Sequence, residues 1–183
     1  MNDVDILKKI EKKVLWLACW MIHNANHIRE NQDGLKVGGH QASSASIVSI
    51  MTALYFNILR PEDRVAVKPH ASPVFHAIQY LSGLQTKEKI ENFRGFGGAQ
   101  SYPSRTKDID DVDISTGSVG LGVAMTSFIS LIQDYIARKK FYNNRQLGRM
   151  IALVGDAELD EGNVYECLQE GWKHDLRNVW WII

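Results

Sequence analysis

Gly155-Asp156-Ala157-Glu158-Leu159-Asp160-Glu161-Gly162-Asn163 follows the apolar run Met150–Val154 and precedes a helical pattern. This order is typical of a buried parallel strand, a tight turn and the N-terminus of a helix. Ligands of α/β sheets bind at the carboxyl ends of the strands. Asp156 at that place, beside helix N–H groups, suits a divalent cation that holds a phosphate. A plain turn with a capping residue has the same pattern, so the rest of the chain must decide.

The composition of the chain argues against several classes of protein. Its 183 residues include 21 Lys and Arg and 21 Asp and Glu, so the net charge of zero favours neither nucleic acid nor a membrane as a partner. The apolar run Val14–Ile22 is shorter than the about 20 residues of a membrane span, and we expect a buried helix there. Cys19 and Cys167 stand far apart in sequence, which favours free thiols and a reducing, cytoplasmic setting. The length predicts one domain over residues 1–183.

Short apolar runs alternate with helical patterns along the chain. This alternation predicts the α/β class, with a parallel sheet flanked by helices on both faces. The apolar strand Asn178–Ile183 has no turn, charge or cap after it, so we expect the domain to be truncated at its C-terminal end. The basic segment Arg138–Arg149 is expected to be an exposed connector. The predicted helices cover residues 3–30, 47–59, 74–81, 86–93, 122–136 and 164–172, and the predicted strands cover 65–67, 150–154 and 178–183. Thr86 is the predicted cap of the helix over residues 86–93.

Two histidines stand where predicted helices begin. His40 follows Gly38-Gly39 at a helix entrance rich in small residues, which allows a ligand to approach the backbone closely. His70 follows the short strand 65–67 and precedes another helix. A capping or packing role would explain either histidine alone, but two histidines at two such turns favour a shared site.

Other groups of polar residues are weaker candidates for a site. His23 and His27 stand four residues apart, a spacing that metal ligands can have, but ordinary surface histidines explain them better without a third ligand. The acidic run is interpreted as a solvated segment in preference to a metal site, and it consists of Asp108, Asp110, Asp111 and Asp113.

Glycines also mark two loops. Tyr102 lies in the glycine-rich loop from Gly95 to Arg105, where it either lines a pocket or anchors the loop. The glycines of residues 114–122 do not form a GxGxxG motif in register, so dinucleotide binding has little support.

Taken in order, these elements resemble the diphosphate-binding domain of thiamine-diphosphate enzymes of the transketolase and 2-oxoacid dehydrogenase group. Within the group, the chain is most similar to the homodimeric decarboxylating components of pyruvate dehydrogenases. The similarity covers residues 37–183. It is carried by Gly38-Gly39-His40-Gln41-Ala42-Ser43, His70-Ala71-Ser72-Pro73, Asn92-Phe93-Arg94, Ser101-Tyr102-Pro103 and Gly155-Asp156-Ala157-Glu158-Leu159-Asp160-Glu161.

The resemblance implies a role for each residue of the candidate site. Asp156 would be a ligand of the Mg2+ that bridges the diphosphate of the cofactor, thiamine diphosphate. His40 would face the reactive carbon and the substrate, and both His40 and His70 are the expected catalytic residues. Glu161 falls where the family forms its dimer interface. The remaining cofactor-binding residues implied by the resemblance are Ser43, His70, Tyr102, Thr116, Gly117, Val119, Gly155, Ala157 and Glu158.

The resemblance also implies an activity and its partners. The expected reaction decarboxylates pyruvate and passes the acetyl group to a lipoyl carrier on an acetyltransferase component. The family needs a pyrimidine-binding domain from across a homodimer, so we expect the 183 residues alone to be inactive. The expected setting is cytoplasmic, without nucleic acid or membrane.

Two departures from the family pattern keep alternatives open. Ala157 replaces a usual glycine, which would weaken diphosphate binding if the backbone there needed a positive φ. A non-catalytic module that retains the fold is therefore an alternative. Gln100-Ser101-Tyr102-Pro103 stands where transketolases carry a Pro-Gly-His-Pro segment with a sugar-contacting histidine, which favours an oxoacid substrate over a ketol transferase. A transketolase and a dehydrogenase for a different 2-oxoacid are the alternatives within the group.

Overall fold

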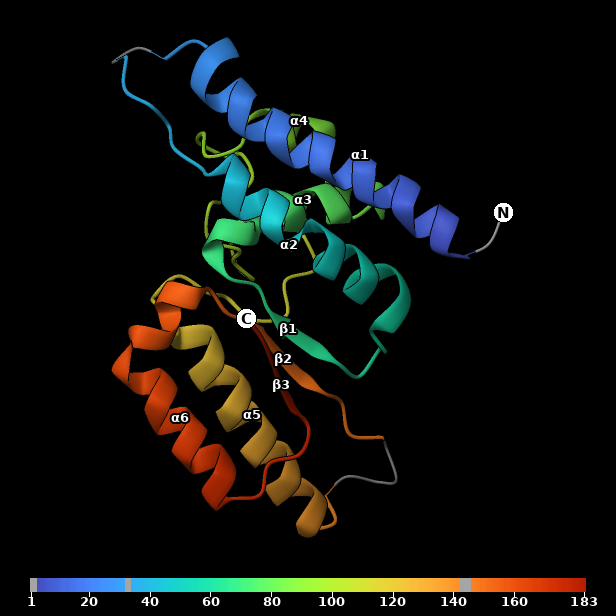
Figure 1. Cartoon of the computed structure of the whole chain (residues 1–183), viewed down its shortest axis with the longest axis vertical. Coiled ribbons are helices and arrows are strands. Elements are labelled where there is room, and N and C mark those ends of the chain that lie inside the picture. Colours follow the sequence, from blue (N-terminus) through green and yellow to red (C-terminus); the bar gives the residue numbers. More distant parts are fainter. Residues whose placement is uncertain (1–2, 32–33, 142–145) are drawn as a thin grey trace. The chain divides into compact units, whose positions relative to one another are not determined.

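A computed structural model of the chain describes residues 3–31, 34–141 and 146–183 (Figure 1). The chain forms two compact units. Unit 1 comprises Met1–Leu59 and Pro69–Val112, and unit 2 comprises Arg60–Lys68 and Asp113–Ile183. The chain thus leaves unit 1 for the short segment Arg60–Lys68, returns, and crosses to unit 2 a second time.

Unit 1 is helical. Helix α1 (Asp3–His23) packs against α2 (Gln41–Ala53) and α3 (Ser72–Leu81), and α2 packs against α3. Single π-helical turns, Asn24–Ile28 and Leu54–Ile58, extend α1 and α2. The short helix α4 (Lys87–Glu91) begins after Thr86, whose side chain accepts a hydrogen bond from the N–H of Lys89 at 3.3 Å. Thr86 is therefore the predicted cap.

The core of unit 1 follows the helical period of its sequence. In α1 and its π-helical extension the buried apolar side chains recur three and four residues apart, as on one face of a helix: Val14, Leu17, Ala18, Met21, Ile22 and Ala25. The buried helix expected at Val14–Ile22 is confirmed for this face, while Leu15 and Trp16 are exposed. Within the described part of the chain, no helix has the length and apolar character to cross a membrane.

Unit 2 is built on a parallel sheet. Strands β1 (Arg64–Ala66), β2 (Met150–Leu153) and β3 (Val179–Ile182) lie in that order, all parallel. Helix α5 (Leu121–Arg138) packs against the three strands, and α6 (Gly162–Lys173) packs beside α5. The register pairs Ala66 with Ala152 and Ala152 with Trp181. These facts confirm the predicted α/β class with a parallel sheet flanked by helices.

Small side chains let the helices of unit 2 approach the sheet. Ala66 and Ala152 lie on the face toward α5, in one buried apolar cluster with Val123 of α5 and with Val164 and Cys167 of α6. A Cβ on Gly122 in the first turn of α5 would lie 3.2 Å from the Cβ of Ala66, so this turn is tightly packed on β1. The small side chains of Ala66 and Ala152, together with Gly122, therefore let α5 pack close to the sheet.

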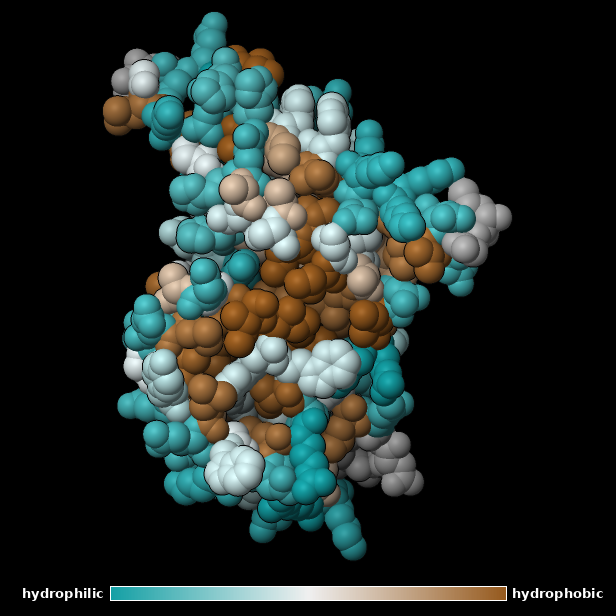
Figure 2. Space-filling view, viewed as in Figure 1, coloured by the Kyte–Doolittle hydropathy of each residue, from teal (hydrophilic) through white to brown (hydrophobic). Residues whose placement is uncertain are grey.

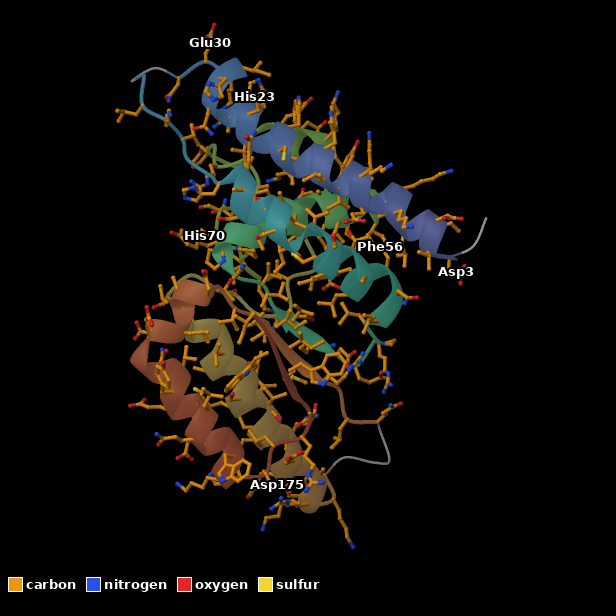
Figure 3. All side chains as sticks on the ribbon, in the orientation of Figure 1. Asp3, His23, Glu30, Phe56, His70 and Asp175 are labelled. Atoms are coloured by element: carbon orange, nitrogen blue, oxygen red, sulfur yellow. The ribbon has the colours of Figure 1, made fainter. Side chains whose placement is uncertain are left out.

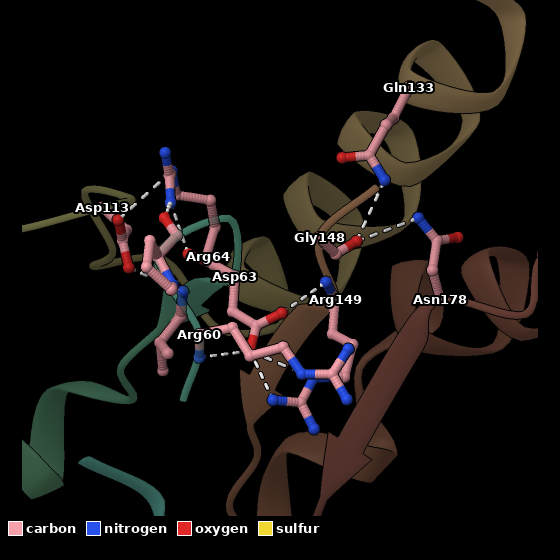
Figure 4. Close-up of polar contacts among 10 residues, drawn as sticks. Arg60, Asp63, Arg64, Asp113, Gln133, Gly148, Arg149 and Asn178 are labelled. Atoms are coloured by element: carbon pink, nitrogen blue, oxygen red, sulfur yellow. Dashed lines mark hydrogen bonds and ion pairs between the residues drawn. The ribbon is translucent and has the colours of Figure 1, made fainter. Parts of the chain in front are cut away.

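The amino ends of β1 and β2 are held by a polar cluster around the buried Asp63 (Figure 4). Its carboxylate accepts hydrogen bonds from the N–H of Arg60 at 2.9 Å, from the N–H of Arg149 at 2.7 Å and from Arg149 Nε at 3.0 Å. The guanidinium of Arg149 also lies over the ring of Trp180, 4.4 Å from its centre. The expectation that Arg138–Arg149 is an exposed connector is therefore wrong for Arg149, whose side chain is largely buried against Asp63. Residues 142–145 of this segment lie outside the described residues.

Further side chains form hydrogen bonds with the backbone at the same end of the sheet. The N–H of Val65 donates to Asp113 Oδ2 at 2.9 Å, and the carbonyl of Gly148 accepts from Gln133 Nε2 at 2.9 Å and from Asn178 Nδ2 at 3.3 Å. Asp113 and Asp63 thus accept hydrogen bonds from backbone N–H groups at the starts of strands, where the hydrogen bonds between strands leave these groups without a partner.

Apolar side chains on the outer faces of α5 and α6 remain exposed. Figure 2 shows apolar surface over the strands of unit 2 and around these helices. The exposed apolar residues of the two helices are Met125, Phe128, Ile132, Tyr135, Tyr165, Leu168 and Trp172. An apolar patch of this extent favours self-association of the isolated chain.

Candidate functional site

Two segments of the predicted site lie at the carboxyl edge of the sheet in unit 2. The strands are parallel, so the residues that follow β1 and β2 emerge at the same edge. Gly155 and Asp156 come directly after β2 and Val154. Thr116 is attached to the end of β1, because its Oγ1 donates a hydrogen bond to the carbonyl of Val67 at 2.6 Å. The edge that binds ligands in α/β sheets therefore carries both segments.

The two segments touch at Gly120. This glycine has a φ of 74°, and a Cβ placed on it would lie 2.0 Å from Asn163 Oδ1 and 3.0 Å from Glu161 Cγ. Only glycine allows so close an approach with this backbone conformation. Asn163 Oδ1 is buried, and no described residue donates a hydrogen bond to it. The loop with Thr116, Gly117 and Val119 is thus in contact with the start of the helix that follows the turn Gly155–Glu158.

The turn after β2 is a short 3-10 helix, Asp156–Asp160. The N–H of Gly155 donates to the carboxylate of Glu158 at 2.6 Å, and the N–H of Glu158 donates back to the carbonyl of Gly155 at 2.9 Å. Ala157 is not among the described residues with positive φ, so the alanine is accommodated without backbone strain. The carboxylate of Asp156 is exposed, and no described residue forms a hydrogen bond or ion pair with it. It is open to a ligand from solution.

The donor set at this turn fits a hard cation bound with a phosphate. Mg2+ prefers a few carboxylate oxygens together with phosphate oxygens and water. Asp156 supplies one accessible carboxylate, and Asn163 Oδ1, which has no donor among the described residues, lies beside Gly120. The residues present are therefore compatible with a metal-bound diphosphate.

The histidines of unit 1 also lie together. The rings of His40 and His70 are in edge-to-face contact, with their centres 5.2 Å apart. His40 occupies the N-cap position of α2, but its side chain does not cap the helix. His70 lies in the 3-10 turn Pro69–Ala71 and is labelled in Figure 3. The shared position predicted for the two histidines is thus observed, and both rings are exposed.

The loop before His40 is held in place by two side chains. Asn26 donates to the carbonyl of Gly38 at 2.9 Å and accepts from the N–H of Gly38 at 2.9 Å. Arg94 Nη1 donates to the carbonyl of Val37 at 3.0 Å. Gly38 has a φ of 92°, and a Cβ on it would lie 2.5 Å from Arg94 Nη1. These contacts fix the entrance of α2, where Ser43 lies in the first turn.

A polar cavity of about 570 Å3 opens beside this entrance. His23, His27, Lys36 and His40 are among its lining residues. The rings of His23 and His27 lie 5.0 Å apart, but the described part of the chain offers no third side chain that would complete a metal site with them. The interpretation of these two as surface histidines is therefore retained.

The acidic run after the Tyr102 loop differs from its sequence interpretation. Tyr102 is 54% exposed, but Asp110 of the run is buried and its carboxylate contacts the ring of His76 in α3. The run is therefore not simply solvated, and His76 was missed as a polar residue of the core. A histidine on the apolar face of a helix, between Phe75 and Ala77, is the signal that could have indicated it.

The free thiols expected at Cys19 and Cys167 lie in different units. Burial raises the pKa of both thiols, and nearby Glu166 and Glu170 raise that of Cys167 further. Neither cysteine has the lowered pKa of a reactive thiol.

Comparison with known proteins gives a family. The model of the family described as transketolase, thiamine diphosphate binding domain, matches residues 37–179. The chain is also similar along its full length to proteins named pyruvate dehydrogenase E1 component, with 26% identity to that of Mycolicibacterium smegmatis and 24% to that of Escherichia coli. A mouse protein named transketolase-like protein 2 is 29% identical over 77% of the chain.

The matched relatives are much longer proteins. The chain spans about a fifth of the relatives named pyruvate dehydrogenase E1 component, with 20% of the Mycolicibacterium smegmatis protein covered. The matched range begins just before the glycines that precede His40 and ends in β3, so it includes both segments of the carboxyl edge. The chain therefore belongs to the family of transketolase thiamine diphosphate binding domains.

Proposed function

We propose that the chain is the diphosphate- and magnesium-binding domain of a thiamine-diphosphate-dependent 2-oxoacid dehydrogenase. The observation that carries this proposal is the exposed Asp156 at the carboxyl edge of the sheet, the same edge that carries the loop of Thr116, Gly117 and Val119. A carboxylate without a protein partner at a ligand-binding edge is available to a cation.

In this proposal each residue of the edge has a distinct task. Asp156 holds Mg2+, which neutralises the charge of the diphosphate. Gly155 and Ala157 flank the diphosphate, and Glu158 keeps the turn in shape through its hydrogen bond with the N–H of Gly155. Thr116 is held against Val67 and lines the cofactor together with Gly117 and Val119.

The histidines of unit 1 supply proton chemistry. When bound, thiamine diphosphate supplies the nucleophilic carbon and the electron sink of the reaction. His40 and His70 are close enough in space to act on one substrate, and both are exposed. Imidazoles can donate or accept a proton near neutral pH. We assign His40 to the substrate side and His70, Ser43 and Tyr102 to the walls of the cofactor site.

We further propose pyruvate as the substrate and a lipoyl-bearing acetyltransferase as the partner that receives the acetyl group. This choice is supported by the name pyruvate dehydrogenase E1 component of several relatives that match the full chain. Residues 1–183 would form one functional domain, and activity would require a pyrimidine-binding domain from across a homodimer, with Glu161 at the interface. The chain alone is then inactive, and its proposed setting is cytoplasmic.

A transketolase is the second candidate, because the mouse relative named transketolase-like protein 2 is 29% identical. Tyr102-Pro103 in place of a sugar-contacting histidine favours the oxoacid dehydrogenase. A non-catalytic module loses its main support, since Ala157 lies in a turn that needs no positive φ.

The proposal is tested by calorimetric titration of thiamine diphosphate into the 183-residue chain, with and without Mg2+. We expect binding that depends on Mg2+ and is weakened at least about tenfold by Asp156→Ala, because a metal ligand is lost. Asp160→Ala is the matched control, since Asp160 is exposed in the same turn. Mg2+-dependent binding that Asp156→Ala leaves unchanged would refute the assignment of Asp156, and the absence of binding also to the homodimer with its pyrimidine-binding domain would refute the proposed site.

A further inference from the structure

A buried histidine lies outside the proposed site. His76 of α3 is fully buried, and its ring contacts the rings of Phe75 and Phe93, with centres 5.6 and 6.1 Å apart. A polar ring surrounded by aromatic side chains is unfavourable unless its nitrogen atoms find partners. Both nitrogen atoms do so, and both partners belong to the segment 100–110 that carries Tyr102.

The two partners determine the protonation of His76. Nε2 lies 2.7 Å from the carbonyl oxygen of Gln100, which can only accept, so Nε2 carries a proton. Nδ1 contacts the carboxylate of Asp110, which accepts when it is ionised. The other oxygen of this carboxylate accepts from Gln85 Nε2 at 2.6 Å. The pair is therefore satisfied as an imidazolium with a carboxylate.

Asp108 holds the same segment from its other side. Its two carboxylate oxygens accept from the N–H of Gln100 at 3.0 Å and from the N–H of Ser104 at 2.8 Å. Gln100 is thus fixed at both its carbonyl and its N–H group, directly before Ser101-Tyr102-Pro103. Every oxygen of Asp108 and Asp110 has a hydrogen-bond donor, so both acids hold the segment in place.

We propose that His76 is a positioning residue that locks segment 100–110 onto α3, and that the lock holds only while the imidazole ring carries its second proton. Loss of that proton leaves the carboxylate of Asp110 buried against a neutral ring, without its charged partner. An unpaired buried charge is strongly unfavourable, so the segment opens and Asp110 reaches water.

The surroundings of the ring give the direction of the pH dependence. The charged groups that face His76 are Asp110 and Asp108, each with an oxygen within 4.8 Å of a ring nitrogen. The other walls, formed by Phe75, Phe93, Gln85 and the carbonyl of Gln100, carry no charge. Burial alone would lower the pKa of His76, but the hydrogen bond and the charge of Asp110 outweigh it and raise the pKa above its ordinary value.

A folded-state pKa that is raised gives a definite pH window. The lock is fully stable below the ordinary histidine value of about 6.5, weakens as the pH rises above it, and is lost when the pH passes the raised value. Within this window the equilibrium constant for opening rises about tenfold per pH unit, because one proton is released.

The test is hydrogen exchange of the 183-residue chain across this pH range, read by mass spectrometry in peptides of residues 100–110. Rates are divided by those of the unfolded chain at the same pH. We expect protection of this segment to fall with rising pH by up to about tenfold per unit, while α1 stays protected. Protection independent of pH in the wild-type chain would overturn the proposal, whether or not any variant folds.

Variants separate the charge from the packing. Asp110→Asn keeps a hydrogen-bonding group of the same shape but removes the negative charge, so protection of segment 100–110 should become lower and lose its pH dependence. His174→Asn is the matched control, because His174 is an exposed histidine whose ion-pair partner among the described residues is Glu170, and it should leave the profile unchanged. A pH profile retained in Asp110→Asn would show that another group titrates and would refute the assignment.

One consequence rests on the proposed function. If Tyr102 lines the cofactor, affinity for thiamine diphosphate should fall over the same pH window in which segment 100–110 opens. Exchange of the segment is measured without cofactor, so the lock can be confirmed even if the cofactor does not bind. A cofactor affinity that is constant through the opening would instead remove Tyr102 from the proposed site.

Discussion

Two aspartates at opposite edges of the sheet in unit 2 illustrate how the same side chain serves two purposes. Asp63 precedes β1 at the amino edge, is buried, and accepts hydrogen bonds from Arg60 and Arg149 (Figure 4). Asp156 follows β2 at the carboxyl edge, is exposed, and has no partner among the described residues. The acid of the amino edge stabilises the fold, and the acid of the carboxyl edge is left open for a ligand.

The reason for this difference lies in the backbone. At the amino edge the first N–H groups of the strands need acceptors, and carboxylates from Asp63 and Asp113 supply them. At the carboxyl edge the chain turns into helices, and the turn after β2 satisfies itself through Glu158 and Gly155. Asp156 is therefore not needed by the fold.

The largest expected effect separates the stability roles of the two aspartates. Asp63→Ala should lower the free energy of unfolding by about 3 kcal/mol or more, because it leaves Arg149 and backbone donors unpaired in a buried place. Asp156→Ala should change it by less than about 0.5 kcal/mol. Urea unfolding followed by tryptophan fluorescence measures both. Equal losses in the two variants would contradict the division of roles.

A smaller effect is expected from two glycines at the carboxyl edge. Gly120→Ala should destabilise the chain by about 1–3 kcal/mol, because φ is 74° there and the new Cβ would meet Asn163. Gly155→Ala is the matched comparison, with a φ of −79° and its nearest neighbour at 3.5 Å, and should change stability by less than about 0.5 kcal/mol. Thermal unfolding of the two variants decides, and a Gly120→Ala chain as stable as the wild type would mean that the two segments do not touch.

The parts of the fold that depend on a regular pattern could be predicted from the sequence. The apolar runs at Val65–Val67 and Met150–Val154 correspond to β1 and β2, with ends that differ by one residue. Thr86 was predicted as a cap because its chemistry is local. The edge position of Asp156 follows from the order of strand, turn and helix alone.

The parts of the fold that depend on contacts between residues far apart in sequence could not be predicted from it. Asp63 and Arg149 are 86 residues apart, and neither neighbourhood indicates the other. Asp110 looked solvated because its neighbours in sequence are acidic, whereas the partner that buries it, His76, is 34 residues away. The harmless position of Ala157 is equally invisible in the sequence, because φ is set by the closure of the turn through Glu158.

The smallest expected effect concerns the charge of Asp63. Burial alone would raise the pKa of Asp63, but hydrogen bonds from Arg149 and Arg60 outweigh it and lower the pKa below its ordinary value. A lowered folded-state pKa contributes stability that is present above the ordinary value of about 3.9 and is lost as the pH falls through the folded-state value. The stability advantage of the wild type over Asp63→Asn should therefore be constant near neutral pH and shrink in acid.

Urea unfolding at several pH values measures this advantage. Asp175→Asn is the control, since Asp175 forms an exposed ion pair with Arg177 and should give little advantage at any pH. An advantage of the wild type over Asp63→Asn that persists undiminished into acid would mean that shape, and not charge, holds the amino edge of the sheet.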